Sequence, residues 1–407
     1  MSGRIAGAQS STSFSLRRVR RLLRKHLLSV NLLLICVPLT FITAALRCHD
    51  VVISLVSFLA IIPLSALVSD ASDTVGDRWG AIIGGLVNAT FGNTVELIVG
   101  ILAISHNELR VAQSIMIGSI LSDTLLVQGF CIIAATRTKG VVAVNSSVVD
   151  MLSSLMLVAA MALVLPTALY ANVIDKGRNF EKTILSYSRA TVAVLLIVYM
   201  SYIYFQVITH SEMFTEVTDD DDHDDIQHLG STDGTSQRSG SDCEMASDDD
   251  DTPSMRQVGI AFAVLITSGI LIGVCTHYFM ESLDGLTEAL GITKAFVALI
   301  IIPIASNAPE LSQVVAAAKK QKVDFAITVI VGSILQIALF VLPCLVMIGW
   351  AMGRPMDLYF DSSQTYVLLF AVILVNQVLQ DRHYTYLHGV MFLCVYAIIS
   401  VAYFIRH

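Results

Sequence analysis

Long, nearly uninterrupted runs of apolar residues dominate the chain, and short polar connections separate them. A helix needs roughly 20 apolar residues to cross a bilayer, and eleven runs approach that length. The runs do not alternate with a period of two, which argues against a transmembrane β-barrel. The pattern predicts an all-α polytopic membrane protein with about eleven transmembrane helices, the tenth short enough to be partly re-entrant. The predicted spans are residues 31–46, 51–69, 81–104, 109–135, 148–169, 191–208, 258–279, 293–318, 323–350, 366–379 and 386–404.

Composition supports this class of protein. The 407 residues are 55% hydrophobic and 14% charged, with a mean hydropathy of +0.72. Soluble domains carry roughly 25% charged residues, so this chain has too few charges to cover several soluble domains. Its seven cysteines are scattered without CxxC pairs, which excludes a disulfide-rich secreted scaffold.

One segment departs from the apolar pattern. Residues 216–251 contain fourteen acids and one arginine among many Ser and Gly. Such a segment cannot bury enough apolar surface to fold alone, so we expect a disordered linker that divides the protein. The expected organisation is a basic tail over 1–28, a first transmembrane helix over 29–48, a five-helix half over 49–208, the acidic loop over 209–256 and a second five-helix half over 257–405.

Basic residues in the short connections predict the orientation, because they favour the cytosolic side. The first 25 residues hold seven Lys and Arg and no acid, and further basic residues follow the fourth and eighth spans. We therefore expect a cytosolic N-terminus, a cytosolic acidic loop and a lumenal C-terminus. An Arg-rich start is also found in transit peptides, and signal peptides begin with a basic region; a tail before a retained helix is the simpler interpretation.

The two predicted halves share a motif. Gly92 to Glu96 matches Ser306 to Glu310, and Gly118-Ser119 matches Gly332-Ser333. The offset is the same at both places, 310 − 96 = 214 and 332 − 118 = 214. Duplicated halves are a hallmark of secondary transporters. Because each half has five predicted spans, an odd number, the halves must be inverted relative to one another.

Each motif places a glutamate inside an apolar helix. A charge at the bilayer centre costs at least ~2.5–3.5 kcal/mol, so Glu96 and Glu310 are candidate functional residues. Asn93 and Asn307 precede them by three residues and share their helix faces, while Gly92 and Pro309 favour a helix break that frees backbone carbonyls.

Such an all-oxygen set suits a hard divalent cation such as Ca²⁺. Ser122 and Gln336, one turn after the paired serines, are candidates for additional side-chain oxygens, whereas the Gly-Ser pairs are explained by close helix packing alone. The alternative is that both glutamates are protonated and only hydrogen-bond helices together; their repetition at equivalent positions argues against it.

Residues 91–122 and 306–350 resemble the two signature repeats of the cation/proton exchangers in the Ca²⁺:cation antiporter superfamily, and fungal vacuolar Ca²⁺/H⁺ exchangers are the most similar members. The resemblance extends from Val51 to Phe404. It implies eleven helices, an N-terminal helix followed by an inverted five-plus-five core, and a vacuolar membrane location. It also implies exchange of cytosolic Ca²⁺ for lumenal H⁺ with Glu96 and Glu310 as shared ion and proton ligands.

Three residues depart from the family motifs: Ser306 replaces a Gly, Leu311 a His and Asp123 an Asn. Asp123 adds a possible proton carrier beside the glutamates. Ion selectivity therefore stays open, with Mn²⁺/H⁺ exchange and Na⁺- or K⁺-coupled exchange as alternatives, and an inactive regulatory relative as another.

We expect a transporter rather than an enzyme, because the spans lack the Ser/His or paired-Asp arrangement of an intramembrane hydrolase. We expect no cofactor. The expected partners are the transported cations, protons and the lipid bilayer, with no nucleic acid; a homo-oligomer is compatible with the sequence.

Overall fold

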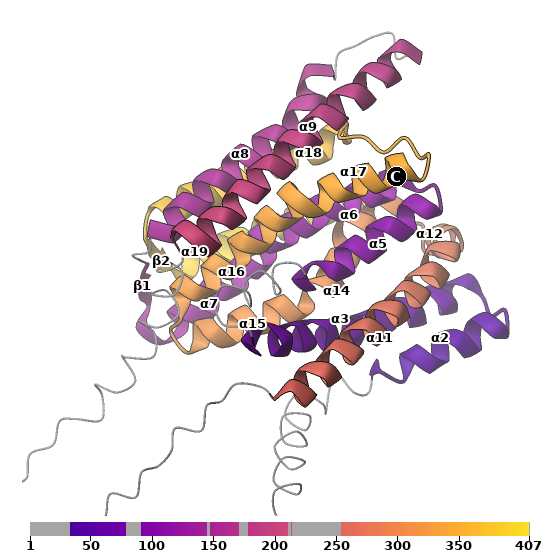
Figure 1. Cartoon of the computed structure of the whole chain (residues 1–407), viewed down its shortest axis with the longest axis horizontal. Helices are drawn as coiled ribbons and strands as arrows, with labels where there is room; N and C mark the ends of the chain where they lie inside the picture. Colours follow the sequence, from indigo (N-terminus) through magenta and orange to yellow (C-terminus); the bar gives the residue numbers. More distant parts are fainter. Residues whose placement is uncertain are drawn as a thin grey trace, which may run out of the picture.

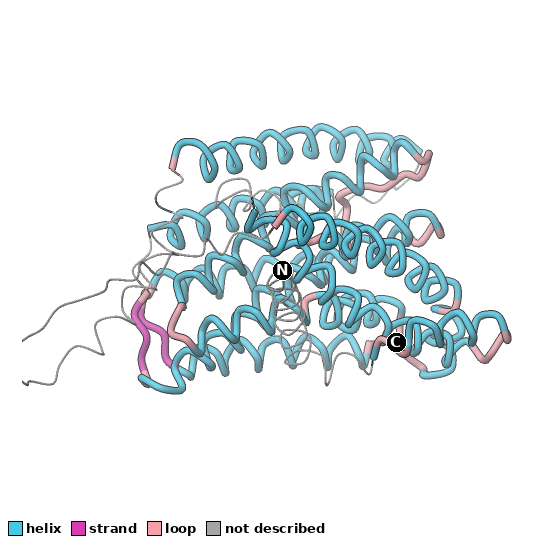
Figure 2. The backbone as a smooth tube through the Cα atoms, turned by 60° about the horizontal axis from the view of Figure 1, so that its bottom comes forward, coloured by secondary structure: helices cyan, strands magenta, loops and turns pink. Residues whose placement is uncertain are grey.

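Long helices lying roughly along one direction build the protein, and one two-stranded sheet closes an end of the bundle (Figures 1 and 2). The computed structural model describes residues 33–78, 91–144, 147–170, 178–210, 213 and 254–406. The elements of the first half are α2 (Cys36–Ala45), α3 (Asp50–Arg78), α5 (Thr94–Ser105), α6 (Leu109–Leu121), η1 (Ser122–Val127), α7 (Gln128–Lys139), β1 (Val141–Ala143), α8 (Ser147–Tyr170), α9 (Arg178–Tyr204) and η2 (Phe205–Thr209). Those of the second half are α11 (Met255–Glu281), α12 (Leu283–Leu290), α13 (Lys294–Phe296), η3 (Val297–Ile301), α14 (Ile302–Ser306), α15 (Ala308–Lys319), α16 (Val323–Gln336), η4 (Ile337–Val341), α17 (Leu342–Ala351), α18 (Ser362–Gln380), β2 (His383–Thr385) and α19 (Tyr386–Ile405).

Eight helices in the described part of the chain are long and apolar enough to cross a membrane, and the pair α12 and α13–α14, bent by 111°, is either a ninth, broken span or a re-entrant loop. Two shorter apolar helices, α2 and α5, accompany them. The predicted count of eleven is not confirmed. The tenth predicted span, whose run looked short enough to be partly re-entrant, is a continuous helix of 19 residues, α18. The basic tail over 1–28 and most of the acidic loop over 209–256 lie outside the described residues.

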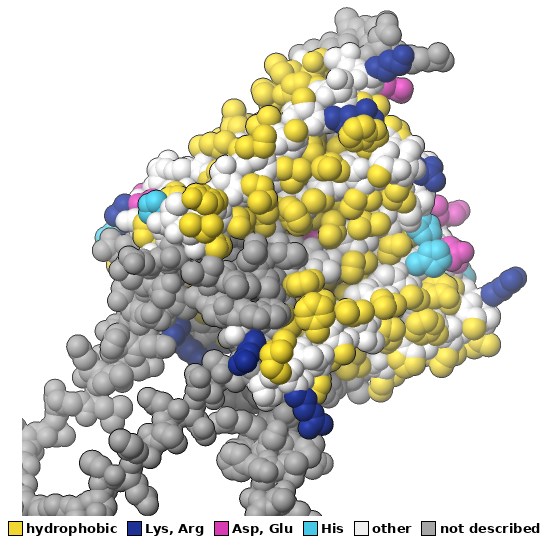
Figure 3. All heavy atoms as spheres, in the orientation of Figure 1, with side chains coloured by type: hydrophobic (Ala, Val, Ile, Leu, Met, Phe, Trp, Pro, Cys, Tyr) yellow, Lys and Arg dark blue, Asp and Glu magenta, His cyan; other side chains and the backbone are white. Residues whose placement is uncertain are grey.

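Apolar side chains form a broad band over the visible face of the bundle, and charged and histidine side chains gather at its margins (Figure 3). The outermost spans are the least enclosed: only 22% of the apolar window is buried in the spans Phe180–Thr209 and Tyr386–Ile405. In the span Leu109–Arg137, which carries the first Gly-Ser motif, 89% is buried. The chain therefore presents its outer helices to lipid and keeps its motif helices in the centre.

Helices from the two halves pair throughout the bundle. α3 packs along α11, and α5 and α15 run from the middle of the bundle toward opposite ends (Figure 1). At one end, β1 pairs antiparallel with β2 and places Val142 opposite Tyr384; we call this the sheet end. α6 approaches η3 closely through Gly118, where an added Cβ would lie 2.3 Å from the Leu299 carbonyl oxygen.

The helices that carry the motifs are interrupted at equivalent places. α5 begins after Asn93, and α14 gives way to α15 at Asn307. The broken helix expected around Gly92 and Pro309 is thus present in both halves. π-Helical turns, η1 and η4, follow the two Gly-Ser helices α6 and α16. Breaks and π-turns leave backbone groups outside the regular helical pattern, and such turns are frequent at functional sites.

Candidate ion-binding site

Polar side chains from both halves are buried where the interrupted helices meet. Glu96 is 3% exposed and Asp123 is completely buried, although apolar helices surround both. Buried ionisable groups at membrane depth are costly, and they mark ion or proton pathways. The other buried polar residues of this cluster are Asn93, Ser119, Ser122, Asn307 and Gln336.

Ser333, on α16, connects the two halves. Its hydroxyl lies 3.1 Å from Glu310 Oε2, 3.2 Å from Asp123 Oδ2 and 3.3 Å from Asn93 Oδ1. A hydroxyl has a single proton, so Ser333 can donate to only one of these acceptors at a time. The group that receives the bond can therefore change when a neighbouring charge changes.

The asparagine of each motif also reaches into the opposite half. Asn93 donates to Gln336 Oε1 at 2.7 Å, and Asn307 donates to Asp123 Oδ1 at 2.5 Å and to the Ser119 carbonyl at 3.3 Å. The two contacts are not equivalent, because the first half offers an acid and the second half an amide. Asp123 thus adds a carboxylate that the second half lacks.

Glu96 lies beside the hydroxyl of Ser306, which bonds in turn to Asn307 Oδ1 at 3.2 Å. The charges of Glu96 and Glu310 both act on Asp123, so the three carboxyl groups share one electrostatic environment. Ser306 stands where the family motif has a glycine, and its side chain lies between the two motifs.

Several buried polar atoms in this cluster have no hydrogen-bond partner among the described residues. They are Glu310 Oε1, Ser119 Oγ, Ser122 Oγ and Gln336 Nε2. Buried polar atoms are normally paired, and unpaired oxygens are the groups that a cation or its hydration water would satisfy.

In the described ranges, no group of three or more His, Cys, Asp or Glu side chains is arranged to hold a metal ion. An ion at this place would therefore need amide, hydroxyl or backbone oxygens in addition to the carboxylates. Such a set favours a hard cation over a soft one.

The structure brings five of the predicted site residues into one hydrogen-bond network: Asn93, Asn307, Gln336, Asp123 and Glu310. Glu96 adjoins it through Ser306, and Ser122 is buried nearby without a hydrogen bond of its own. The sequence interpretation missed the role of Ser333 because it treated both Gly-Ser pairs as spacers. The signal was available: Ser333 lies one turn before Gln336, on the same helix face.

Most of the chain matches the model of a known protein family. The family model described as sodium/calcium exchanger protein matches residues 49–208 and 260–405. The chain belongs to this exchanger family. Its relatives include a vacuolar calcium ion transporter of Schizosaccharomyces pombe, 32% identical over 374 residues that cover 92% of this chain and 84% of that protein. A Ca²⁺/H⁺ antiporter of Aphanothece halophytica is 33% identical over 372 residues, which cover 91% of this chain and 95% of that one.

Solved structures of other exchangers share the fold. Native YfkE superposes with a TM-score of 0.73 at 23% identity, covering 92% of this chain and 99% of YfkE. The H⁺/Ca²⁺ exchanger CAX gives 0.62 at 15% identity, with 92% and 91% covered. The exchanger-family fold predicted from the sequence is therefore confirmed.

Proposed function

We propose that this exchanger-family protein is a secondary antiporter that exchanges cytosolic Ca²⁺ for lumenal H⁺ across the vacuolar membrane. The observation that carries the proposal is the Ser333 hydroxyl, which joins the second-half carboxylate of Glu310 to Asp123 and Asn93 of the first half. Ligands from both halves thus meet at one buried place, as alternating access requires. The relatives named as vacuolar calcium transporters and Ca²⁺/H⁺ antiporters support the choice of ions.

In this proposal Glu96 and Glu310 are the central ligands. The amide oxygens of Asn93, Asn307 and Gln336 and the hydroxyl of Ser122 complete an oxygen set of the size that Ca²⁺ prefers. Some of the amides would have to rotate to do so, since Asn93 and Asn307 now direct their NH₂ groups at Gln336 and Asp123.

Competition for the site produces exchange. Two ionised glutamates neutralise one divalent ion, and burial disfavours leaving both charged when that ion departs. Proton uptake restores near-neutrality, so the ion-bound and protonated forms can pass through an occluded state while the empty charged form cannot. Asp123 accepts hydrogen bonds from Asn307 and Ser333, and we assign it the role of an additional proton carrier.

The sheet end is the cytosolic side in this scheme, which places the N-terminus and the acidic loop in the cytosol and the C-terminus in the lumen. The described C-terminal residues do lie at the opposite end from β1 and β2 (Figure 1). The protein then works as a transporter embedded in the bilayer, and its scheme needs no cofactor beyond the transported ions.

Purified protein in liposomes with an acidic interior tests the proposal. A pH-sensitive dye inside the vesicles reports proton efflux when Ca²⁺, Mn²⁺, Na⁺ or K⁺ is added outside. We expect Ca²⁺ to release protons in a saturable way. Proton release by Mn²⁺ alone, or Ca²⁺ flux that follows a Na⁺ or K⁺ gradient, would replace the ion assignment, and no response to any cation would favour an inactive regulator.

A further inference from the structure

Tyr396 has a buried hydroxyl that the scheme above does not use. It lies on the buried stripe of α19, which also includes Gly389, Phe392, Ile399 and Tyr403. Tyr396 is 4% exposed, and its hydroxyl has no hydrogen-bond partner in the described structure. An unsatisfied buried hydroxyl destabilises the state that contains it. The cost is recovered in a state of the protein that gives this hydroxyl a partner.

Helix packing brings this hydroxyl to the ion site. α7 leads into β1 and α19 leaves β2, and because these strands pair antiparallel, the two helices run in opposite directions. They touch at a pair of glycines: an added Cβ on Gly389 would lie 2.6 Å from the Gly129 carbonyl oxygen. Seven residues away from this contact, in the same direction along the bundle, lie Ser122 and Tyr396. α19 also packs directly against η1, the turn that begins at Ser122. The Ser122 and Tyr396 hydroxyls therefore face one another.

Like the Tyr396 hydroxyl, Ser122 Oγ is buried without a hydrogen-bond partner in the described structure. Thr124, two residues further on, bonds to the carbonyl of Ile120 one turn back, whereas Ser122 makes no such bond. A hydroxyl that gives a lone pair to a cation must also direct its proton to an acceptor elsewhere. The Tyr396 oxygen faces Ser122 and is free to accept it.

We propose that Tyr396 is a positioning residue of the ion site: its phenol oxygen accepts the Ser122 proton and so turns the Ser122 oxygen toward the bound cation. This inference rests on the proposed function. It adds the last helix, α19, to a site that otherwise consists of motif residues. Removing a residue that hydrogen-bonds to a metal ligand typically changes the metal affinity by about 10–100-fold.

The test compares initial rates of Ca²⁺ uptake by proteoliposomes at fixed ΔpH for the whole protein and for Tyr396→Phe. We expect the half-saturating Ca²⁺ concentration to rise about ten-fold with the maximal rate little changed. Ser122→Ala should give a similar rise, and the double variant should add nothing further, because either change removes the same interaction. Tyr396→Phe removes an oxygen that has no partner in this structure, so we expect the fold to be kept.

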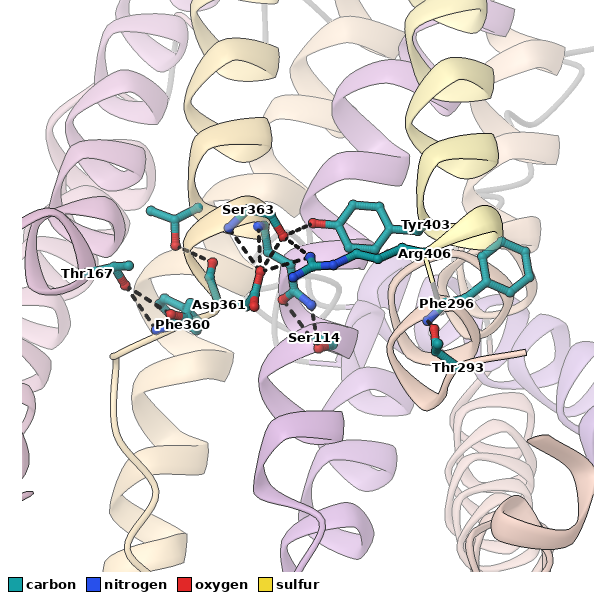
Figure 4. A network of polar contacts seen from close by, with 11 residues as sticks. Ser114, Thr167, Thr293, Phe296, Phe360, Asp361, Ser363, Tyr403 and Arg406 are labelled. Atoms are coloured by element: carbon teal, nitrogen blue, oxygen red, sulfur yellow. Dashed lines mark hydrogen bonds and ion pairs between the residues drawn. The ribbon is translucent and has the colours of Figure 1, made fainter. Parts of the chain in front are cut away.

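Tyr403→Phe is the matched control. Tyr403 lies on the same stripe seven residues later, and its hydroxyl bonds to Ser363 at 2.8 Å, away from the ion site (Figure 4). Its loss should leave the half-saturating concentration unchanged. A wild-type value in Tyr396→Phe, or additive effects with Ser122→Ala, would overturn the positioning role while leaving exchange intact. Absence of Ca²⁺ uptake by the wild type would instead refute the proposed exchange and this role with it.

Discussion

Asn93 donates a hydrogen bond of 2.7 Å to Gln336, a residue of the opposite half of the chain. Asn307 also donates across the halves, to Asp123. The length of each bond therefore depends on how the two halves are placed. A relative movement of the halves alters both bonds. In the proposed scheme, these contacts couple ion binding to the conformational change that alternating access requires.

Removing either amide should weaken Ca²⁺ binding. We expect Asn93→Ala and Asn307→Ala each to raise the half-saturating Ca²⁺ concentration about ten-fold, since each loses a candidate ligand and a contact between halves. Asn376→Ala is the control, because Asn376 is an amide on α18 whose buried Oδ1 has no partner. Ca²⁺ uptake kinetics in proteoliposomes make the comparison, and equal behaviour of all three variants would remove the asparagines from the site.

Asp123 should set the number of protons exchanged. Asn in its place keeps one oxygen that can accept the bond from Asn307, but its NH₂ group cannot accept the bond from Ser333, and it cannot carry a proton. We expect Asp123→Asn to transport Ca²⁺ with one proton fewer per ion. The ΔpH at which net Ca²⁺ flux vanishes, measured at several Ca²⁺ gradients, gives this ratio. An unchanged ratio would mean that Asp123 serves only as a hydrogen-bond acceptor.

Gly118 and Gly332 occupy equivalent positions in the two repeats but should respond differently to the same substitution. An alanine Cβ at Gly118 would lie 2.3 Å from the Leu299 carbonyl oxygen, whereas at Gly332 its nearest neighbour would be the Tyr202 hydroxyl at 3.9 Å. We expect Gly118→Ala to destabilise the protein by about 1–3 kcal/mol through overpacking. Gly332→Ala should be neutral or slightly stabilising. Thermal unfolding in detergent distinguishes them, and equal midpoints would contradict the packing described for α6 and η3.

The start of α18 offers a pH-dependent contribution to stability. Asp361 caps this helix and contacts Ser363 and Arg406 (Figure 4). Partial burial alone would raise the pKa of Asp361, but hydrogen bonds from Ser363 and the Arg406 charge outweigh it and hold that pKa below its usual value. A lowered folded-state pKa stabilises the protein above the unfolded pKa of about 3.9, and this contribution is lost as the pH falls through the folded-state value.

Asp361→Asn isolates that charge, because Asn caps helices as well as Asp does. At neutral pH we expect it to be less stable than wild type by at most about 1 kcal/mol, since the pair is partly exposed, and the difference should vanish in acid. Asp361→Ala should lose about 1 kcal/mol more at any pH through the missing cap. Unfolding midpoints across a pH series measure both effects; a difference between wild type and Asp361→Asn that grew toward acid would contradict the lowered pKa.

The apolar runs predicted the spans well where hydrophobicity alone decides them. The run over 148–169 corresponds to α8 (Ser147–Tyr170), and the run over 386–404 to α19 (Tyr386–Ile405). The shared offset of 214 residues likewise predicted which polar residues would meet. It did not predict the central position of Ser333 or the proximity of Tyr396 to Ser122, because both depend on how helices far apart in sequence approach one another. For the same reason it gave Gly118 and Gly332 one role, although only Gly118 lies at a tight contact.

Substitution of the two glutamates tests the central claim most directly. Glu96→Gln and Glu310→Gln keep the size and hydrogen-bonding capacity of each side chain but remove its charge and its titratable proton. Glu281→Gln, at an exposed acid beside His277, is the control. The measurement is ΔpH-driven uptake of radiolabelled Ca²⁺ into proteoliposomes. The account predicts uptake at the level of protein-free vesicles for both site variants and normal uptake for the control; near-normal uptake by either site variant would contradict it.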